Sequence, residues 1–233
     1  MTECGVSSSS DRIRSHCLGG PEGASLSKSI YVVTHPEATH HIHGVVGGWF
    51  DSDLTERGVE QAETIASSLV TRLDGATAEI LSSDLLRARR TAEVIAKRLQ
   101  MDVTLDPDLR EKSYGEAEGK PRAWLTERVI PLPEIGERLR HDEGIPGAET
   151  RMDLAERAYR VIDGLQHSPH EQHILVTHGG TSTLLIAAWI GMPIDAAGLV
   201  NFQVSSGSIT VLRKDSRNFS HQLAQLNDVS HLA

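Results

Sequence analysis

The chain has 233 residues, enough for one sizeable domain, and its 39% hydrophobic and 24% charged residues are typical of soluble globular proteins. A formal net charge of −9 without any basic run argues against a nucleic-acid partner, and no apolar run approaches the roughly 18 residues that span a membrane. The two cysteines, Cys4 and Cys17, both precede the first predicted strand, which excludes a disulfide framework. The start of the chain has no apolar signal-peptide core, and this favours the cytoplasm.

The chain divides into three expected parts. Residues 1–27 are rich in serine and glycine and show no periodicity, so we expect a disordered tail there. We expect one catalytic domain over residues 28–215, without internal repeats, and a C-terminal tail over residues 216–233.

Two apolar runs end in the same way. Residues 29–34 form a β-branched run that stops at His35, and residues 173–177 form another that stops at His178, before Gly179 and Gly180. Ligands of open α/β sheets bind at the carboxyl ends of the strands. We therefore expect His35 and His178 to meet at one end of the sheet.

The remaining elements alternate between helix and strand. A loop rich in glycine and histidine is expected over residues 40–49, and residues 106–150 carry short helices at most. Helical spacing predicts a helix from Thr55, a second capped by Ser82 or Ser83, and two more over residues 154–165 and 181–190. Short strands are expected over residues 78–81 and 101–105, and a closing hairpin around Gly207 over residues 201–204 and 208–212. This order predicts an α/β fold, a three-layer, doubly wound, mostly parallel sheet with helices on both faces.

Four residues near the predicted strand ends suggest one chemistry: His35, Arg87, Glu111 and His178. Each alone has an ordinary structural explanation. Together they fit phosphoryl transfer, because a neutral imidazole can attack phosphorus and a guanidinium fork suits a phosphate. His178, if protonated, would donate a further hydrogen bond, and Gly179 would let a helix N-terminus approach the anion. Glu111 would protonate the leaving alcohol and then activate water, without a metal or cofactor.

The sequence resembles the histidine phosphatase superfamily, in its phosphoglycerate-mutase-like branch. The matching segments agree in order and spacing over roughly residues 29–212; they are residues 35–37, 48–51, 54–62, 82–88, 91–92, 109–111, 115, 118–119, 147–150 and 177–180. The resemblance implies that His35 is the nucleophile, that Arg87 and His178 bind phosphate, and that Glu111 is the proton donor.

The first motif departs from the family pattern. The family normally has Arg-His-Gly where this chain has Thr34, His35 and Pro36, and an asparagine usually found seven positions after that arginine is His41 here. Protonated His41 or His43 and the hydroxyl of Thr34 would supply phosphate ligands instead. Arg89 or Arg90 would replace the missing charge only if their helix faces the site.

Several functions remain open at this point. The leading hypothesis is a phosphomonoester hydrolase that acts on a phosphorylated small molecule through a phosphohistidine on His35. A catalytically impaired phosphate-binding protein and a phosphoglycerate-mutase-type phosphotransferase are alternatives, and residues 119–147 form a shorter insertion than mutases typically carry. A metal-dependent hydrolase would use His40, His41 and His43, although no carboxylate cluster completes a metal site. A homodimer is a further open alternative.

Overall fold

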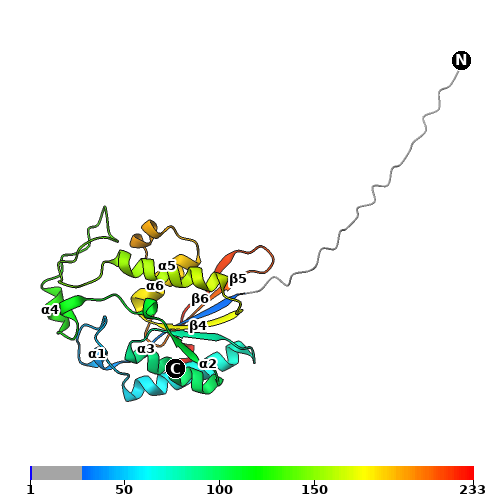
Figure 1. Ribbon diagram of the computed structural model, residues 1–233, viewed down its shortest axis with the longest axis horizontal. Helices are drawn as coiled ribbons and strands as arrows, with labels where there is room; N and C mark the ends of the chain where they lie inside the picture. The colour runs from blue at the N-terminus through cyan, green and yellow to red at the C-terminus, as the bar shows by residue number, and fades with distance from the viewer. Residues whose placement is uncertain (2–27) are drawn as a thin grey trace.

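The computed structural model describes Met1 and residues 28–233 (Figure 1). Apart from Met1, the expected tail over residues 1–27 lies outside the described residues. The described part contains a six-stranded sheet with the order β3-β2-β4-β1-β5-β6. Its strands are β1 (Ser29–Thr34), β2 (Glu79–Ser82), β3 (Val103–Leu105), β4 (Gln172–Thr177), β5 (Ile209–Lys214) and β6 (His221–Asp228).

The sheet is mostly parallel, as predicted. The pairs β1–β4, β2–β4 and β2–β3 are parallel, whereas β5 pairs antiparallel with both β1 and β6. In the central pair Thr34 lies opposite Thr177, so both of these strands end at the same level. The residues that follow them, His35 and His178, are thereby placed side by side.

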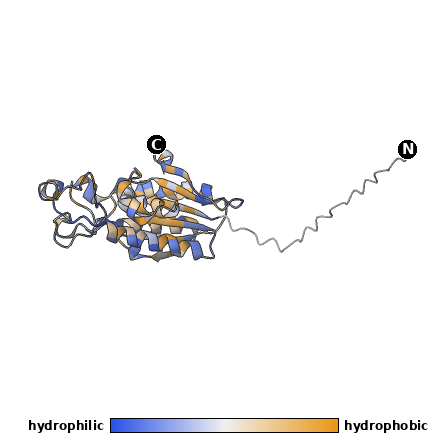
Figure 2. Ribbon diagram, turned by 90° about the horizontal axis from the view of Figure 1, so that it is seen from above, coloured by the Kyte–Doolittle hydropathy of each residue, from blue (hydrophilic) through white to orange (hydrophobic). Residues whose placement is uncertain are grey.

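Helices cover both faces of the sheet (Figure 1). The long helices are α2 (Glu56–Leu73), α3 (Leu86–Leu99), α5 (Arg151–His167) and α6 (Gly179–Trp189), and the shorter ones are α1 (Thr39–Ile42), α4 (Arg122–Thr126), η1 (Pro107–Leu109), η2 (Gly115–Ala117), η3 (Ile194–Leu199) and η4 (Ser230–Leu232). The pair α2 and α3 packs on one face with Val33 and Val176, and the pair α5 and α6 packs on the other with Val32 and Leu175. Figure 2 shows the hydrophobic residues gathered between these layers. The three-layer α/β prediction is confirmed.

The helix predicted from Thr55 is confirmed, because the Thr55 side chain accepts a hydrogen bond from the Gly58 backbone N–H at 2.9 Å. The expected cap of α3 is wrong, since its N-cap is Leu85 and makes no side-chain capping bond. Among the described residues, no helix combines the length and the apolar character needed to cross a bilayer.

The predicted end of the fold is wrong. Residues 216–233 were expected to be a tail, but they contain β6 and η4, and residues 201–204 are not a strand. The hairpin therefore joins β5 to β6. Strand β6 was not predicted because it lacks the buried β-branched run that identifies a strand in a sequence. It is a largely exposed edge strand that contains Gln222 and Gln225.

Candidate active site

The two strand-end histidines meet, as expected. The backbone N–H of His35 donates to the carbonyl of Thr177 at 2.9 Å, and the ring centroids of His35 and His178 lie 5.0 Å apart. Their approach depends on the pairing of β1 with β4 and not on any contact that is local in sequence.

His35 is held with one ring nitrogen free to react. Its Nδ1 lies 2.9 Å from the carbonyl oxygen of Pro36, and because a carbonyl can only accept, Nδ1 carries the proton of the neutral ring. Nε2 then bears the lone pair, and it accepts a hydrogen bond from Arg87 Nε at 3.2 Å. Burial, together with the charge of Arg87, lowers the pKa of His35 well below its usual value. A buried neutral imidazole of this kind is suited to nucleophilic attack.

Arg87 is a fixed cation beside that lone pair. It is the second residue of α3 and only 1% exposed. Its Nη1 donates to the carbonyl of Phe50 at 2.9 Å and its Nη2 to the carbonyl of Gly48 at 2.7 Å. Burial lowers the pKa of Arg87 to about 10, which the carboxylate of Glu111 opposes, so the guanidinium stays charged at neutral pH.

His178 presents a polar atom without a partner. Its Nε2 lies 2.9 Å from Ser83 Oγ, and within the described part of the chain its buried Nδ1 makes no hydrogen bond. When the hydroxyl of Ser83 donates to Nε2, Nδ1 carries the proton and can donate to an anion. Burial and then the charge of Arg87 lower the pKa of His178 well below its usual value, so the free site holds it neutral instead of protonated.

Glu111 is fixed against the start of α6. Its Oε1 accepts from the backbone N–H of Lys112 and its Oε2 from that of Gly180, both at 2.9 Å. A Cβ atom on Gly180 would lie 2.4 Å from Oε1 of Glu111, so the carboxyl group can occupy its present position only because residue 180 is glycine. The carboxyl group therefore has a defined position in the same pocket as His35 and Arg87.

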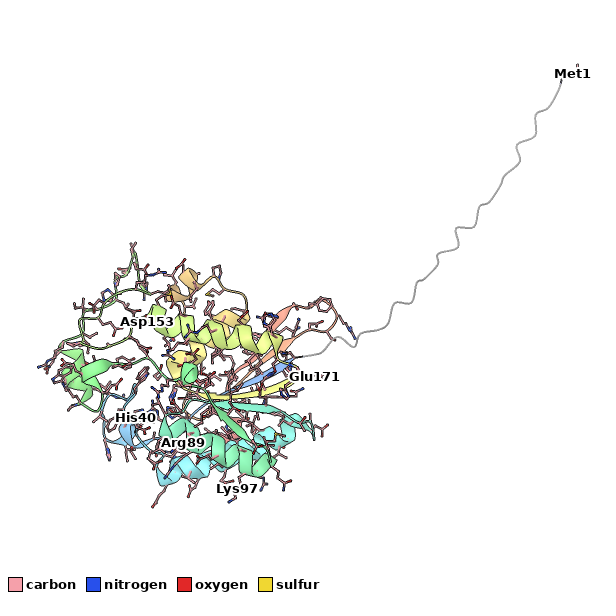
Figure 3. All side chains as sticks on the ribbon, in the orientation of Figure 1. Met1, His40, Arg89, Lys97, Asp153 and Glu171 are labelled. Carbon is pink, nitrogen blue, oxygen red and sulfur yellow. The ribbon has the colours of Figure 1, made fainter. Side chains whose placement is uncertain are left out.

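A short helix, α1, replaces the loop that was expected around His40. The rings of His40 and His41 lie 4.0 Å apart, and His41 stacks on His35 at 5.6 Å with an interplanar angle of 13°. Figure 3 shows His40 at the end of the sheet where β1 and β4 terminate. His40 Nδ1 contacts Ser52 Oγ at 2.7 Å, and His41 Nδ1 accepts from the Ala38 N–H at 3.1 Å.

These rings are neutral in the free site. Burial, followed by the charge of His41, lowers the pKa of His40 to about 3, and burial, followed by the charge of Arg122, lowers the pKa of His41. His43 is exposed to solvent. Over residues 28–233, no group of three or more His, Cys, Asp or Glu side chains is arranged to hold a metal ion, so the geometry does not fit the metal-dependent alternative.

Some expected ligands are not brought to the pocket. The hydroxyl of Thr34 lies 3.3 Å from Ser182 Oγ, and Thr34 does not line the pocket. Gly179 begins α6, but the contact with Glu111 is made by the next residue, Gly180. Arg89 and Arg90 face other partners, since Arg89 lies 3.6 Å from Glu93 and Arg90 lies 2.7 Å from Asp53.

The pocket and the histidines beside it have contacts that the sequence did not predict. It has a volume of about 340 Å³, and Tyr114 and Arg122 line it together with His35, Arg87 and Glu111. Ser83 follows β2 at the same end of the sheet, and this strand-end position could have revealed it. No local pattern distinguishes Arg122, because its segment lacks apolar periodicity.

Comparisons with known proteins agree with this geometry. The family model described as histidine phosphatase superfamily (branch 1) matches residues 30–228. A probable phosphoglycerate mutase of Proteus mirabilis is 31% identical over 218 residues, which cover 87% of this chain and 94% of that protein. A putative phosphoserine phosphatase 2 of Hydrogenobacter thermophilus is 27% identical over 206 residues, covering 88% and 97%.

Solved structures give the same result. Mycobacterial glucosyl-3-phosphoglycerate phosphatase in complex with VO3 aligns with a TM-score of 0.71 at 26% identity, covering 86% of this chain and 98% of that one. The alpha-ribazole phosphatase from Shigella flexneri aligns with a TM-score of 0.68 at 27% identity, covering 86% and 96%.

Proposed function

This chain belongs to the histidine phosphatase superfamily (branch 1), and from that premise we propose that it hydrolyses phosphomonoesters of small molecules through a phosphohistidine on His35. One observation carries the proposal: the Nε2 lone pair of His35 lies 3.2 Å from Arg87 Nε, in a ring whose other nitrogen is held by the Pro36 carbonyl. A nucleophile and a cation for the phosphoryl oxygens are thereby held together.

The first half-reaction forms the phosphoenzyme. Nε2 of His35 attacks phosphorus, the bond from phosphorus to the ester oxygen breaks, and Glu111, which enters this step as the carboxylic acid, gives its proton to the departing alcohol and becomes a carboxylate. Once Nε2 of His35 is bonded to phosphorus it no longer accepts from Arg87, whose Nε hydrogen then donates to a phosphoryl oxygen, and Nδ1 of His178 donates to another. Because Nδ1 of His35 keeps its bond to the Pro36 carbonyl, the ring stays aimed at phosphorus.

The second half-reaction restores the enzyme. Water enters in place of the alcohol, Glu111 accepts one of its protons, and the oxygen attacks phosphorus. The bond between Nε2 and phosphorus breaks, and inorganic phosphate leaves. The net reaction consumes one phosphomonoester and one water and releases one alcohol and one phosphate.

The testing experiment measures phosphate release from p-nitrophenyl phosphate by the native chain, His35→Ala and His43→Ala, each with and without a chelator. We expect the loss of His35 to lower kcat/KM by at least about 10³-fold, because the nucleophile is removed. His43→Ala is the matched control, since this ring is exposed. Activity should survive the chelator, and acid-sensitive phosphate should appear on the native protein but not on His35→Ala. Activity that persists in His35→Ala, or that the chelator abolishes, contradicts the proposal.

Two alternatives have specific support. The position of Thr34 against Ser182 leaves the end of β1 without a cation and favours a phosphate-binding protein without turnover. Phosphate binding by titration, with no product from a panel of phosphomonoesters, would establish that alternative. The relatives named phosphoglycerate mutase favour phosphoryl transfer to a second hydroxyl. Product analysis separates this from hydrolysis, because only hydrolysis releases phosphate. A homodimer and a cytoplasmic location stay predictions.

A further inference from the structure

The pocket has few charges with which to hold a phosphate. Among the described residues that line it, only Arg87 and Arg122 are cationic. A phosphomonoester carries close to two negative charges at neutral pH. The histidine rings around the pocket are neutral when it is empty, so Arg87 alone leaves the anion undercompensated. A second cation is therefore needed, and Arg122 is the lining residue that can supply it.

The fold fixes the backbone of Arg122 beside the histidines. Its N–H donates to the carbonyl of Gly44 at 3.0 Å, and Val46 N–H donates to the carbonyl of Lys120 at 2.9 Å. Pro121 forms a bridge with Val45 in the same place. The start of α4 is thus tied to the chain that follows α1, and three residues of α4, namely Arg122, Leu125 and Thr126, line the pocket.

The guanidinium of Arg122 is free to bind an anion. Within the described residues it makes no side-chain hydrogen bond and lies within 4 Å of no carboxylate. Other arginines around the site are engaged: Arg110 binds Asp84 at 2.5 Å and Arg157 binds Glu149 at 2.8 Å. The charge of Arg122 also reaches the α1 rings, because after burial it is the larger of the two arginine effects that lower the pKa of His41.

We propose, as a deepening of the proposed function, that Arg122 is the second phosphate-binding cation of this site. Arg122 binds the phosphate from α4. It compensates for the arginine that the family has at the end of β1, where this chain has Thr34. Arg87 binds the phosphoryl group next to His35, and Arg122 binds it from α4. The site is rebuilt around a cation from a different element, so Thr34 need not contact the anion.

The test compares Arg122→Met and Arg122→Lys with Arg128→Met. Arg128 is a matched control, because it is an exposed arginine in the same segment that lies over the Trp124 ring at 4.5 Å and does not line the pocket. The measured quantity is the dissociation constant of inorganic phosphate by calorimetry, together with its inhibition constant against p-nitrophenyl phosphate. We expect Arg122→Met to weaken phosphate binding about 10- to 100-fold, Arg122→Lys to recover part of that loss, and Arg128→Met to change nothing.

Calorimetry keeps this inference separate from the proposed function, because phosphate binds whether or not the protein turns over. Unchanged phosphate affinity in Arg122→Met overturns the inference. So does a fall in kcat/KM at constant phosphate affinity, which would place Arg122 on the leaving group. As a further readout, the pKa of His41 followed by NMR should rise in Arg122→Met and not in Arg128→Met, and an unmoved His41 would contradict the stated geometry.

Discussion

The two ends of strand β4 carry buried histidines with opposite surroundings. His173 lies at the amino end and His178 follows the carboxyl end, and they are 0% and 1% exposed. Burial lowers the pKa of both, to about 4 for His173 and well below the usual value for His178. Figure 3 shows the two ends of the sheet, with Glu171 labelled at one and His40 at the other.

The two histidines differ in the residues that surround them. Around His178 the ends of β1, β2 and β4 bring together His35, Ser83 and Arg87, and a pocket opens beside them. His173 Nε2 lies 3.3 Å from Glu79 Oε2, and among the described residues neither ring nitrogen of His173 makes a hydrogen bond. Burial and a lowered pKa therefore do not identify a site. The identifying features are converging strand ends, a fixed cation and a cavity.

The largest difference in activity is expected between variants of two glutamates: Glu111, in the pocket, and Glu79, at the opposite end of the sheet. Glu111→Gln should lower kcat about 10²- to 10⁴-fold on alkyl phosphates, because it removes the proton donor while its amide keeps one of the two backbone contacts. The loss should be much smaller on p-nitrophenyl phosphate, whose leaving group needs no proton. Glu79→Gln should leave kcat unchanged on both substrates. Equal losses on the two substrates in Glu111→Gln would show that this carboxyl group does not transfer the proton.

The histidines themselves give the second contrast. His178→Leu should lower kcat/KM about 10²- to 10³-fold, because it removes a donor to the phosphoryl group from a buried site. His173→Leu should leave kcat/KM within about threefold, since its ring contacts no residue of the pocket. Both variants need a thermal melt to show that they fold. Comparable activity losses at the two ends would mean that His178 acts only through stability.

The sequence was enough to predict the four catalytic candidates, but not the residues that hold them in place through hydrogen bonds. His35 and His178 could be placed because each ends a recognisable strand, and the α/β order brings such ends together. Arg87 and Glu111 needed the family resemblance as well, because a single arginine or glutamate in a helix or loop has no distinctive local pattern. Ser83 and Gly180 were missed as contacts because each acts on a residue far away in the chain.

The errors share a physical origin. Thr34 was expected to add a hydroxyl to the phosphate site because it stands where the family has an arginine, but its hydroxyl lies against Ser182 and it does not line the pocket. His41 was expected to bind phosphate if protonated, and burial lowers its pKa and so opposes that charge. Strand β6 was missed because edge strands need not be apolar. Each error concerns an environment that only the folded chain defines.

Stability should respond to pH in the same way at both ends. A lowered pKa means that the unfolded chain binds a proton below pH 6.5 while the folded ring does not, so the free energy of unfolding falls as the pH drops from 6.5 towards the folded pKa. For His173 this window ends at about pH 4. Between pH 7 and 4.5, His173→Leu should therefore lose about 2 to 3 kcal/mol less stability than the native chain, as measured by urea denaturation.

His178→Leu should also lose less stability than the native chain as the pH falls, because burial lowers the pKa of His178 in the same direction. Stability effects of the same sign in the two variants, together with unequal losses of activity, would separate burial from function. A native chain whose stability does not change over this range would mean that these rings take up protons in the folded state.

The smallest difference in kcat/KM is expected between alanine variants of two glycines. Gly180→Ala places a methyl group against Glu111 Oε1, so the carboxyl group must move, and kcat/KM should fall about 10- to 100-fold. Gly164→Ala adds the same methyl group to α5, where nothing lies within 4 Å of it, close to Glu79 at the amino end of the sheet. That change should raise the free energy of unfolding by about 0.5 to 1 kcal/mol and leave kcat/KM unchanged, because alanine loses less backbone entropy than glycine in a helix. If Gly180→Ala were as active as the native chain, Glu111 would tolerate displacement and its fixed position would not limit catalysis.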